Sequence, residues 1–172
     1  LPQTYQTTSG KPCLRLKLKR KDSIYLCPQD VVRQCSKGEY ICISNVHTTV
    51  MSYEDPEYCK VQNTAYLRLP DGKPLSVVAK KRGFKEAERV TGPDLMKEIF
   101  EISEECGFTH YFYGSTEETL ELLKEKLLAK YPNLNIVGMY SPPFRALSEE
   151  EDKKIIQMIN KTKPDFVWVG LG

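Results

Sequence analysis

From about residue 40 onward, the hydrophobic residues of this chain follow two alternating patterns. Short runs rich in β-branched and aromatic residues predict strands, and longer runs with apolar residues three or four positions apart predict helices. The strands are expected at residues 40–44, 64–69, 109–113, 134–139 and 165–169. The last of them contains Phe-Val-Trp-Val without polar alternation, which predicts a strand buried on both faces.

The helix predictions rest on capping residues as well as on periodicity. Ser115 with Glu118, and Ser148 with Glu151, fit the capping-box pattern that opens a helix. Helices are therefore expected from about 115 to 131, from 149 to 160, from 74 to 81 and from about 94 to 106. Strands alternating with helices indicate an α/β fold, Rossmann-like, with a mainly parallel sheet and right-handed crossover helices on both faces.

Small, polar or acidic residues follow each predicted strand at its carboxyl end. They are Ser44-Asn45, Pro70-Asp71-Gly72, Gly114-Ser115, Tyr140-Ser141-Pro142-Pro143 and Gly170-Leu171-Gly172. Parallel strands place their carboxyl ends at one edge of a sheet, and open α/β sheets bind ligands there. We therefore expect these residues to line a common cleft.

Asp71 has two interpretations. Pro70 favours a turn, an aspartate can bond the backbone amides of that turn, and Gly72 tolerates unusual backbone angles, so Asp71 can be structural. A carboxylate at the lip of a partly dry cleft can instead act as a general base. The sequence leaves both interpretations open.

Two further segments carry candidate phosphate-binding groups. Arg89 lies just before the helix expected to begin near Asp94, where a guanidinium can bind phosphate and Asp94 can cap the helix. A surface ion pair with a glutamate is the alternative for Arg89. Gly114-Ser115 also precedes a helix, so free amides there can hold phosphate, although Glu117 and Glu118 would repel an anion and favour a simple capped helix start.

The two histidines give no metal signal. His47 and His110 lack the spacing of a metal pair, and the sequence has no D-x-D, no H-E-x-x-H and no clustered cysteines. We therefore expect neither a protein-bound metal nor a cofactor. His47 follows Asn45 closely and is a candidate for lining the cleft, with a half-buried structural histidine as the alternative. The absence of a G-x-G-x-x-G segment and of a P-loop disfavours dinucleotide or ATP binding.

Basic charge is concentrated near the amino end. The net charge is +2, yet residues 11–21 contain six lysines and arginines and no acid. Leu14, Leu16 and Leu18 alternate with basic residues, which predicts a strand with one cationic face. It can be a solvated edge strand or a contact for anionic lipid headgroups. Nucleic acid is the least favoured partner, and none is expected.

No apolar run approaches the roughly 20 residues of a membrane-spanning helix. The first ten residues lack the basic start and apolar middle of a signal peptide. We therefore expect a cytoplasmic protein.

Five segments occur in a fixed order along the chain. They are Ser44-Asn45-Val46-His47, Leu69-Pro70-Asp71-Gly72, Glu88-Arg89-Val90-Thr91-Gly92-Pro93-Asp94-Leu95, Phe112-Tyr113-Gly114-Ser115 and Pro164-Asp165-Phe166-Val167-Trp168-Val169-Gly170-Leu171-Gly172. Together, over residues 38–172, they resemble the WecG/TagA/CpsF family of bacterial glycosyltransferases.

The resemblance implies an inverting, metal-independent hexosyltransferase at the inner face of the cell membrane. It would move an N-acetylmannosamine-type sugar from a UDP-sugar to a sugar on a polyprenyl diphosphate, in teichoic acid or other surface polysaccharide synthesis. The family's general base falls on Asp71, its cleft arginine on Arg89 and its early asparagine on Asn45. The other residues expected to bind substrate are His47, Gly72, Thr91, Gly92, Asp94, Gly114, Ser115, Tyr140, Ser141 and Gly170.

We expect two parts in the chain. Residues 1–37 form a basic amino-terminal segment that matches the family poorly, and residues 38–172 form the glycosyltransferase domain. Family members continue past G-L-G into a P-K-Q-E segment, so this domain is expected to be truncated at its carboxyl end. Ile43 stands where many relatives carry threonine.

The alternatives are another Rossmann-like sugar-nucleotide enzyme, or a non-catalytic or truncated nucleotide-sugar-binding domain. The donor sugar, the acceptor and the oligomeric state stay open, with a homo-oligomer among the alternatives.

Overall fold

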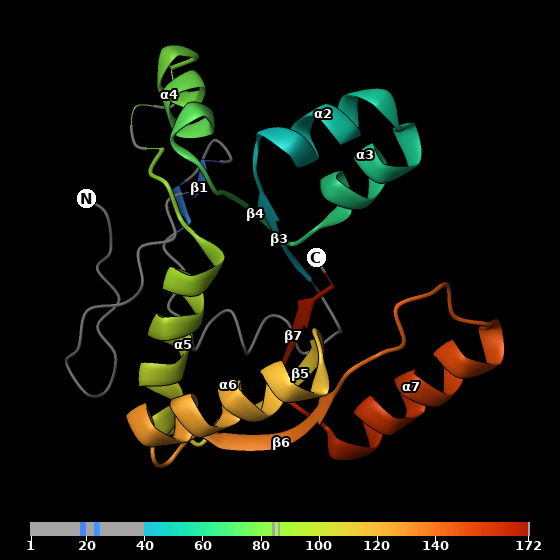
Figure 1. Ribbon diagram of the computed structural model, residues 1–172. Coiled ribbons are helices and arrows are strands. Elements are labelled where there is room, and N and C mark those ends of the chain that lie inside the picture. Colours follow the sequence, from blue (N-terminus) through green and yellow to red (C-terminus); the bar gives the residue numbers. More distant parts are fainter. Residues whose placement is uncertain (1–17, 20–22, 25–39, 84, 86, 172) are drawn as a thin grey trace. The chain divides into compact units, whose positions relative to one another are not determined.

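The computed structural model describes residues 18–19, 23–24, 40–83, 85 and 87–171 (Figure 1). The chain divides into two compact units, Leu1–Glu98 and Ile99–Gly172, and each is described by itself. The elements are β1 Leu18–Lys19, β2 Ser23–Ile24, β3 Ile41–Ser44, α2 Val46–Glu54, α3 Pro56–Thr64, β4 Leu67–Pro70, α4 Lys73–Lys81, α5 Gly92–Cys106, β5 Thr109–Gly114, α6 Glu117–Lys130, β6 Asn135–Tyr140, α7 Glu149–Thr162 and β7 Phe166–Gly170.

The first unit is built on a parallel pair of strands, β3 and β4. Helices α2 and α3 connect them, and the sequence pattern did not predict either helix. Neither helix buries a residue, so neither presents the buried apolar stripe that marks an amphipathic helix of a globular core. Their caps were the available signal, because Asn45 begins α2 and the Asp55 carboxylate accepts hydrogen bonds from the first amides of α3.

The amino-terminal basic strand is described only in part. Leu18–Lys19 forms β1, which pairs antiparallel with β2. The rest of the predicted strand, and the predicted boundary between residues 37 and 38, lie outside the described residues. Among the residues that the structure describes, no helix has both the length and the hydropathy that crossing a bilayer requires.

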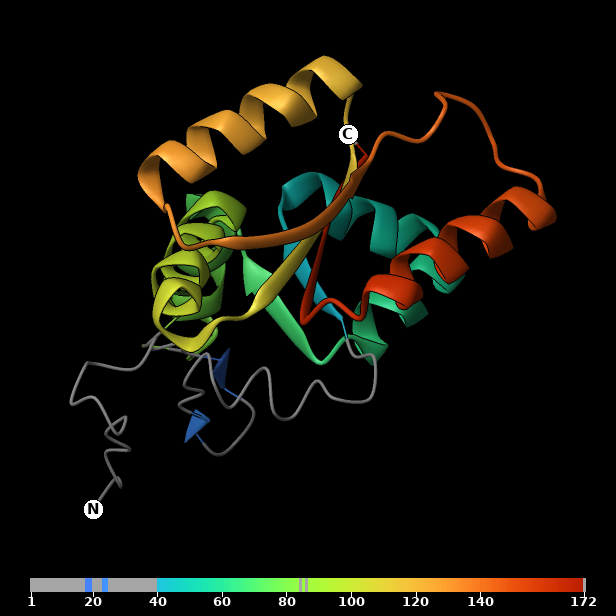
Figure 2. The same cartoon turned by 90° about the horizontal axis from the view of Figure 1, so that it is seen from below.

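The second unit is a three-stranded parallel sheet in the order β6-β5-β7. Helix α6 leads from the centre to one edge strand, and α7 leads from there to the other edge strand. Right-handed connections in opposite directions place α6 and α7 on opposite faces of this sheet (Figure 2). The predicted Rossmann-like α/β class is confirmed, with the parallel strands distributed over two open sheets.

Two local predictions for the second unit are wrong. Strand β7 is an edge strand, and one of its faces is largely open, with Val167 43% and Val169 64% exposed. The N-cap of α6 is Thr116, whose hydroxyl accepts from the Thr119 amide, and not Ser115. Ser115 has a φ of 61°, whereas an N-cap residue needs an extended backbone.

His110 lies at the centre of the aromatic core of this unit. Its side chain is fully buried and stacks on Phe166 at 5.3 Å between ring centroids, and the Phe100 ring lies perpendicular to it at 5.1 Å between centroids. Trp168 Nε1–H donates to His110 Nδ1 at 3.1 Å, which assigns the proton of the neutral ring to Nε2. Burial lowers the pKa of His110 from 6.5 to about 4, against the opposing charge of Asp165.

His110 should therefore make this unit sensitive to acid. Between pH 6.5 and about 4 the unfolded chain binds a proton at this position that the folded chain rejects, so stability rises with pH across this window. The full effect is about 3 kcal/mol. Urea unfolding at several pH values should show this slope in the natural protein. In His110→Phe the gain in stability between pH 4 and 6.5 should be smaller by about 3 kcal/mol, and an equal pH dependence in the two proteins would contradict the assignment.

The carboxyl ends of β5 and β7 meet without room for a side chain. Gly114 has a φ of +127°, and a Cβ atom added there would lie 2.1 Å from the carbonyl oxygen of Gly170. The Ser115 amide donates to the same oxygen at 3.0 Å. Glycine at position 114 is therefore required both by the backbone angle and by the close approach of the neighbouring strand.

Gly114→Ala and Gly107→Ala should separate these two requirements. Gly107 also has a positive φ, +72°, but a Cβ atom there would meet nothing within 4 Å. Gly107→Ala should cost about 1–2 kcal/mol from backbone strain alone. Gly114→Ala should cost about 1–3 kcal/mol more, because β5 and β7 must also move apart. Thermal or urea unfolding measures both, and equal losses would show that the close approach is unimportant.

Candidate active site

Asp71 stands at the junction of the two strands of the first unit. Its amide donates to the carbonyl oxygen of Ser44, at the end of β3, at 2.7 Å. Within the described part of the chain, its carboxylate contacts Arg89 and bonds no backbone amide of its own turn. Gly72, with a φ of 112°, provides the unusual backbone angle of the turn instead. The carboxylate is therefore not used to shape the turn, and 30% of the side chain is exposed.

Arg89 is the partner of Asp71. Its Nε and Nη2 atoms both lie 3.5 Å from Asp71 Oδ1. The Val90 amide donates to the carbonyl oxygen of Pro70 at 3.0 Å and holds this segment at the end of β4. The sequence left open an ion pair between Arg89 and a glutamate. In the structure the carboxylate beside Arg89 is that of Asp71, the candidate base. Because the Arg89 side chain is 56% exposed, this ion pair is worth no more than about 1 kcal/mol, and the guanidinium can exchange partners.

Asn45 and His47 follow the neighbouring strand end. The Asn45 Oδ1 atom accepts from the Thr48 amide, and Thr48 Oγ1 accepts from the Asn45 amide, each at 2.9 Å. This capping box uses the oxygen of the carboxamide, so its nitrogen is the atom that can contact a ligand. His47 is exposed in the first turn of α2, and the half-buried alternative is wrong.

Helix α5 begins two residues earlier than predicted, at Gly92. The Thr91 hydroxyl accepts from the Asp94 amide at 3.1 Å and donates to the Asp94 carboxylate at 2.6 Å. Thr91 therefore has the capping role predicted for Asp94, which lies inside the first turn, where a carboxylate is favourable. Position 92 lies next to Ile43, since a Cβ atom there would be 3.8 Å from the Ile43 side chain.

The second unit brings together its own five predicted residues, Gly114, Ser115, Tyr140, Ser141 and Gly170. The Ser141 hydroxyl donates to the Ser115 carbonyl oxygen at 2.6 Å. The Ser115 amide donates to the Gly170 carbonyl oxygen, so it is not free to hold phosphate, which was one of the two interpretations of Gly114-Ser115. Tyr140 stacks on Tyr113 with 6.2 Å between ring centroids. The sequence pattern did not predict this stack.

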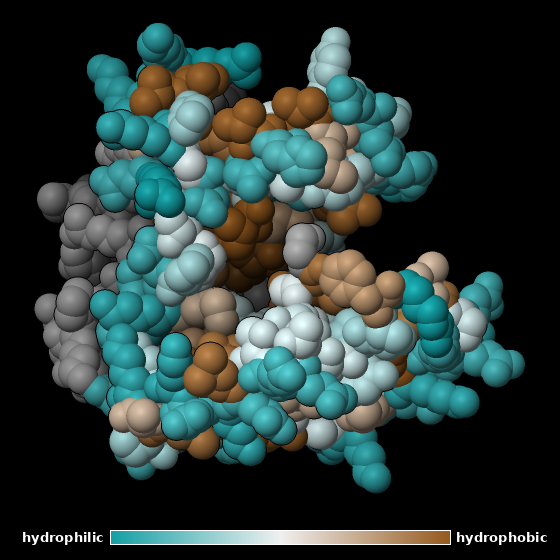
Figure 3. Space-filling model, viewed as in Figure 1, coloured by the Kyte–Doolittle hydropathy of each residue, from teal (hydrophilic) through white to brown (hydrophobic). Residues whose placement is uncertain are grey.

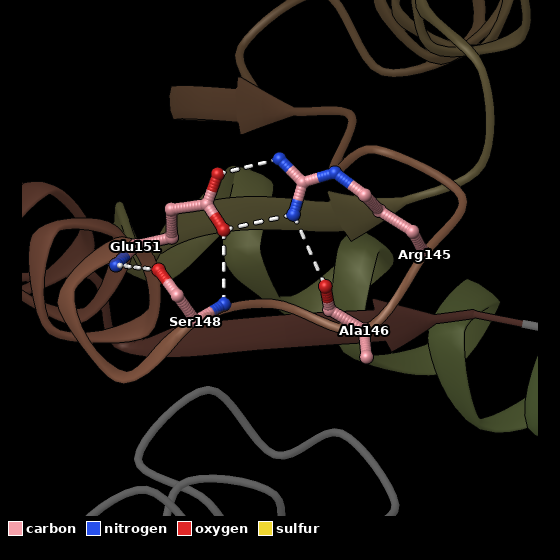
Figure 4. Close-up of polar contacts among 4 residues, drawn as sticks. All are labelled: Arg145, Ala146, Ser148 and Glu151. Atoms are coloured by element: carbon pink, nitrogen blue, oxygen red, sulfur yellow. Dashed lines mark hydrogen bonds and ion pairs between the residues drawn. The ribbon is translucent and has the colours of Figure 1, made fainter.

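The loop after Tyr140 is held by an arginine that the sequence pattern did not single out (Figure 4). Arg145 donates to both carboxylate oxygens of Glu151, at 2.9 and 2.6 Å. The Ser148 amide donates to the same carboxylate at 2.9 Å. Hydrogen bonds from Arg145, and then from Ser148, lower the pKa of Glu151 to about 2. The capping box predicted the Ser148–Glu151 pair, but an arginine six residues before Glu151 lies outside helical spacing.

A metal site does not emerge from this geometry. Within the described ranges, no group of three histidine, cysteine, aspartate or glutamate side chains is arranged to hold a metal ion. The cation beside Asp71 is the guanidinium of Arg89.

Comparison with known proteins finds relatives that share one name. A protein of Bacillus spizizenii is 26% identical over 137 residues, which is 80% of this chain and 51% of that protein. A protein of Staphylococcus aureus is 25% identical over 141 residues, 81% of this chain and 53% of that protein. Both are named N-acetylglucosaminyldiphosphoundecaprenol N-acetyl-beta-D-mannosaminyltransferase. The chain spans about half the length of these relatives.

The profile of one family matches residues 19–172, nearly the whole chain. The match includes the segments that carry Asp71, Arg89 and the residues of the second unit. The chain therefore belongs to the glycosyl transferase WecG/TagA/CpsF family.

Proposed function

We propose that the protein is an inverting, metal-independent glycosyltransferase. It moves an N-acetylmannosamine-type sugar from a UDP-sugar to a sugar carried on a lipid diphosphate, in cell-surface polysaccharide or teichoic acid synthesis. The names of the relatives give this sugar and this class of acceptor for those proteins. For this chain, the observation that carries the proposal is the carboxylate of Asp71, which bonds no backbone amide in the described residues and lies beside Arg89.

Asp71 is the proposed general base. It takes the proton of the acceptor hydroxyl while that oxygen attacks the anomeric carbon from the face opposite the diphosphate. The bond from the anomeric carbon to the diphosphate oxygen breaks, and UDP leaves with the electron pair. The single displacement inverts the configuration at that carbon. The partial exposure of Asp71 supports this role, because an acceptor hydroxyl can reach the carboxylate.

Arg89 is the proposed partner of the leaving diphosphate. Its planar guanidinium matches two phosphate oxygens and offsets the negative charge that grows on them during bond breaking. The 3.5 Å pair with Asp71 supports an exchange of partners. When the donor binds, a diphosphate oxygen replaces Asp71 on the guanidinium, and the carboxylate becomes available to the acceptor.

The other candidate residues are assigned to substrate positioning. In the first unit, the Asn45 amide nitrogen, His47 and Thr91 lie on the segments that flank Asp71. In the second unit, Tyr140 and Ser141 lie at the carboxyl end of β6, where the loop that contains Arg145 begins. A lipid-linked acceptor would place the working protein at the inner face of the cell membrane.

A direct assay tests the proposal. The chain is incubated with a set of UDP-sugars and a short-chain lipid diphosphate carrying N-acetylglucosamine, and the products are analysed by mass spectrometry. We expect UDP release and one added N-acetylhexosamine with inverted configuration. A thermal-shift comparison of UDP, NAD and ATP should show stabilisation by UDP alone. Stabilisation by NAD instead would favour a Rossmann-like oxidoreductase.

Asp71→Asn should lower turnover by about 10²- to 10⁴-fold, the usual contribution of a general base. Affinity for UDP should stay within a factor of two or three. Asp55→Asn is the matched control, because asparagine also caps a helix and Asp55 caps α3 in the same unit. Kinetics with calorimetric UDP titration measures both effects. Turnover that survives in Asp71→Asn would remove the proposed base.

Arg89→Gln should weaken transition-state stabilisation by about 10²- to 10³-fold in kcat/KM. Arg89→Lys should recover only part of it, because an ammonium cannot bind two phosphate oxygens in one plane. Arg68→Gln is the matched control, since Arg68 is an exposed arginine on β4 that bonds Asn63. Full activity in Arg89→Lys would show that a point charge is sufficient.

A further inference from the structure

Helix α4 combines two features that neither the fold nor the proposed chemistry requires. Residues 73–82 read Lys-Pro-Leu-Ser-Val-Val-Ala-Lys-Lys-Arg, with four cationic side chains and no acid. Two valines of the same helix are exposed, Val77 at 42% and Val78 at 47%. In the space-filling view, an apolar patch surrounded by hydrophilic residues lies over α4 (Figure 3).

The helical geometry gathers these residues on one side. At about 100° per residue, Leu75, Ser76 and Ala79 share one face, and these are the buried or half-buried positions of α4. The opposite arc carries the exposed residues, in the angular order Lys80, Lys73, Val77, Lys81, Pro74, Val78 and Arg82. Cationic and apolar side chains therefore alternate across a single exposed face.

Intramolecular interactions do not account for this face. Within the described residues, no carboxylate pairs with a cation of α4. Lys80 and Lys81 lie in the last turn, where cations favour the helix dipole. Lys73 is at the opposite end, where a cation is unfavourable, and the dipole explains neither exposed valine. The composition of the face is better explained by an external partner.

The chemistry of the face fits an anionic lipid surface. Basic side chains attract anionic headgroups, while apolar side chains between them enter the boundary of the acyl region. A single-stranded nucleic acid would be bound through stacking on aromatic residues, and α4 has none. We propose that the exposed face of α4 is a docking surface for anionic phospholipid headgroups.

Lipid binding by this surface would also determine how far Asp71, the candidate base, lies from the membrane. Helix α4 begins at Lys73, directly after Asp71 and Gly72, so a lipid-bound α4 holds Asp71 close to the headgroups. A sugar on a lipid diphosphate would be presented at the same level. This consequence rests on the proposed function, whereas lipid binding by α4 does not depend on it.

The test measures binding of the full chain to vesicles of phosphatidylcholine, with and without one quarter phosphatidylglycerol. The charge variant is Lys80→Gln/Lys81→Gln/Arg82→Gln. The matched control, Lys124→Gln/Lys126→Gln/Lys154→Gln, removes three exposed cations from α6 and α7. The basic amino-terminal residues are retained in all proteins. Because each cation near an anionic surface contributes roughly a fivefold factor, the charge variant should bind about a hundredfold more weakly. The control should bind like the natural protein.

A second variant, Val77→Ser/Val78→Ser, tests the apolar part of the face. It should bind about tenfold more weakly but keep the salt dependence of the natural protein, since the charges remain. The charge variant should lose much of that salt dependence. Melting temperatures of all four proteins should agree, which separates lipid contact from folding.

Three results would overturn the proposal. One is equal binding of the natural protein to both kinds of vesicle, and another is equal loss in the charge variant and its control. The third is tight binding of a single-stranded oligonucleotide, lost in the charge variant, without vesicle binding. Transfer to a water-soluble acceptor is measured on the same proteins and should be unaffected by the α4 variants. Absence of transfer in every protein would contradict the proposed function and leave the vesicle result standing.

Discussion

Two backbone hydrogen bonds hold the candidate chemistry of the first unit in place. The Asp71 amide joins the end of β4 to Ser44 at the end of β3, and the Val90 amide joins the arginine segment to Pro70. Every residue except proline has a backbone amide and a carbonyl group, so bonds of this kind need no particular side chain. The turn and the arginine segment are therefore held without using the Asp71 carboxylate or the Arg89 guanidinium. Side chains that the fold does not use are available for a substrate.

The two arginine pairs of this chain illustrate the difference between structure and chemistry. Arg145 binds both oxygens of Glu151 at 2.9 and 2.6 Å and fixes a loop. Arg89 meets a single oxygen of Asp71 at 3.5 Å and stays largely exposed. Charge-assisted hydrogen bonds of the first kind are short and specific, whereas the second kind contributes little stability. The looser pair is the one suited to exchanging its carboxylate for a diphosphate.

The second unit shows how the same sheet-edge arrangement limits its own ligand contacts. The close approach at Gly114 allows the Ser115 amide to bond the Gly170 carbonyl oxygen, so this donor, which precedes the Thr116 N-cap of α6, is not available to a ligand. The Ser141 hydroxyl is likewise directed to Ser115. Neighbouring strand ends therefore satisfy each other's polar groups, and the rings of Tyr113 and Tyr140 stack on one another beside them.

The sequence by itself determined the parallel α/β class, the five strands from β3 onward and helices α4 to α7 in outline, and it offered Asp71 and Arg89 as two separate candidates. These follow from periodicity, caps and short motifs, which are properties of neighbouring residues. Helices α2 and α3 were not predicted because they bury no side chain. The exposed face of β7 was not predicted because the local sequence pattern does not reveal the order of the strands in a sheet. Only the tertiary structure decided that Arg89 meets Asp71, that the Ser115 amide is occupied and that the cations of α4 share a face with exposed valines. Each depends on contacts between residues distant in sequence, or on which face of an element the rest of the chain covers.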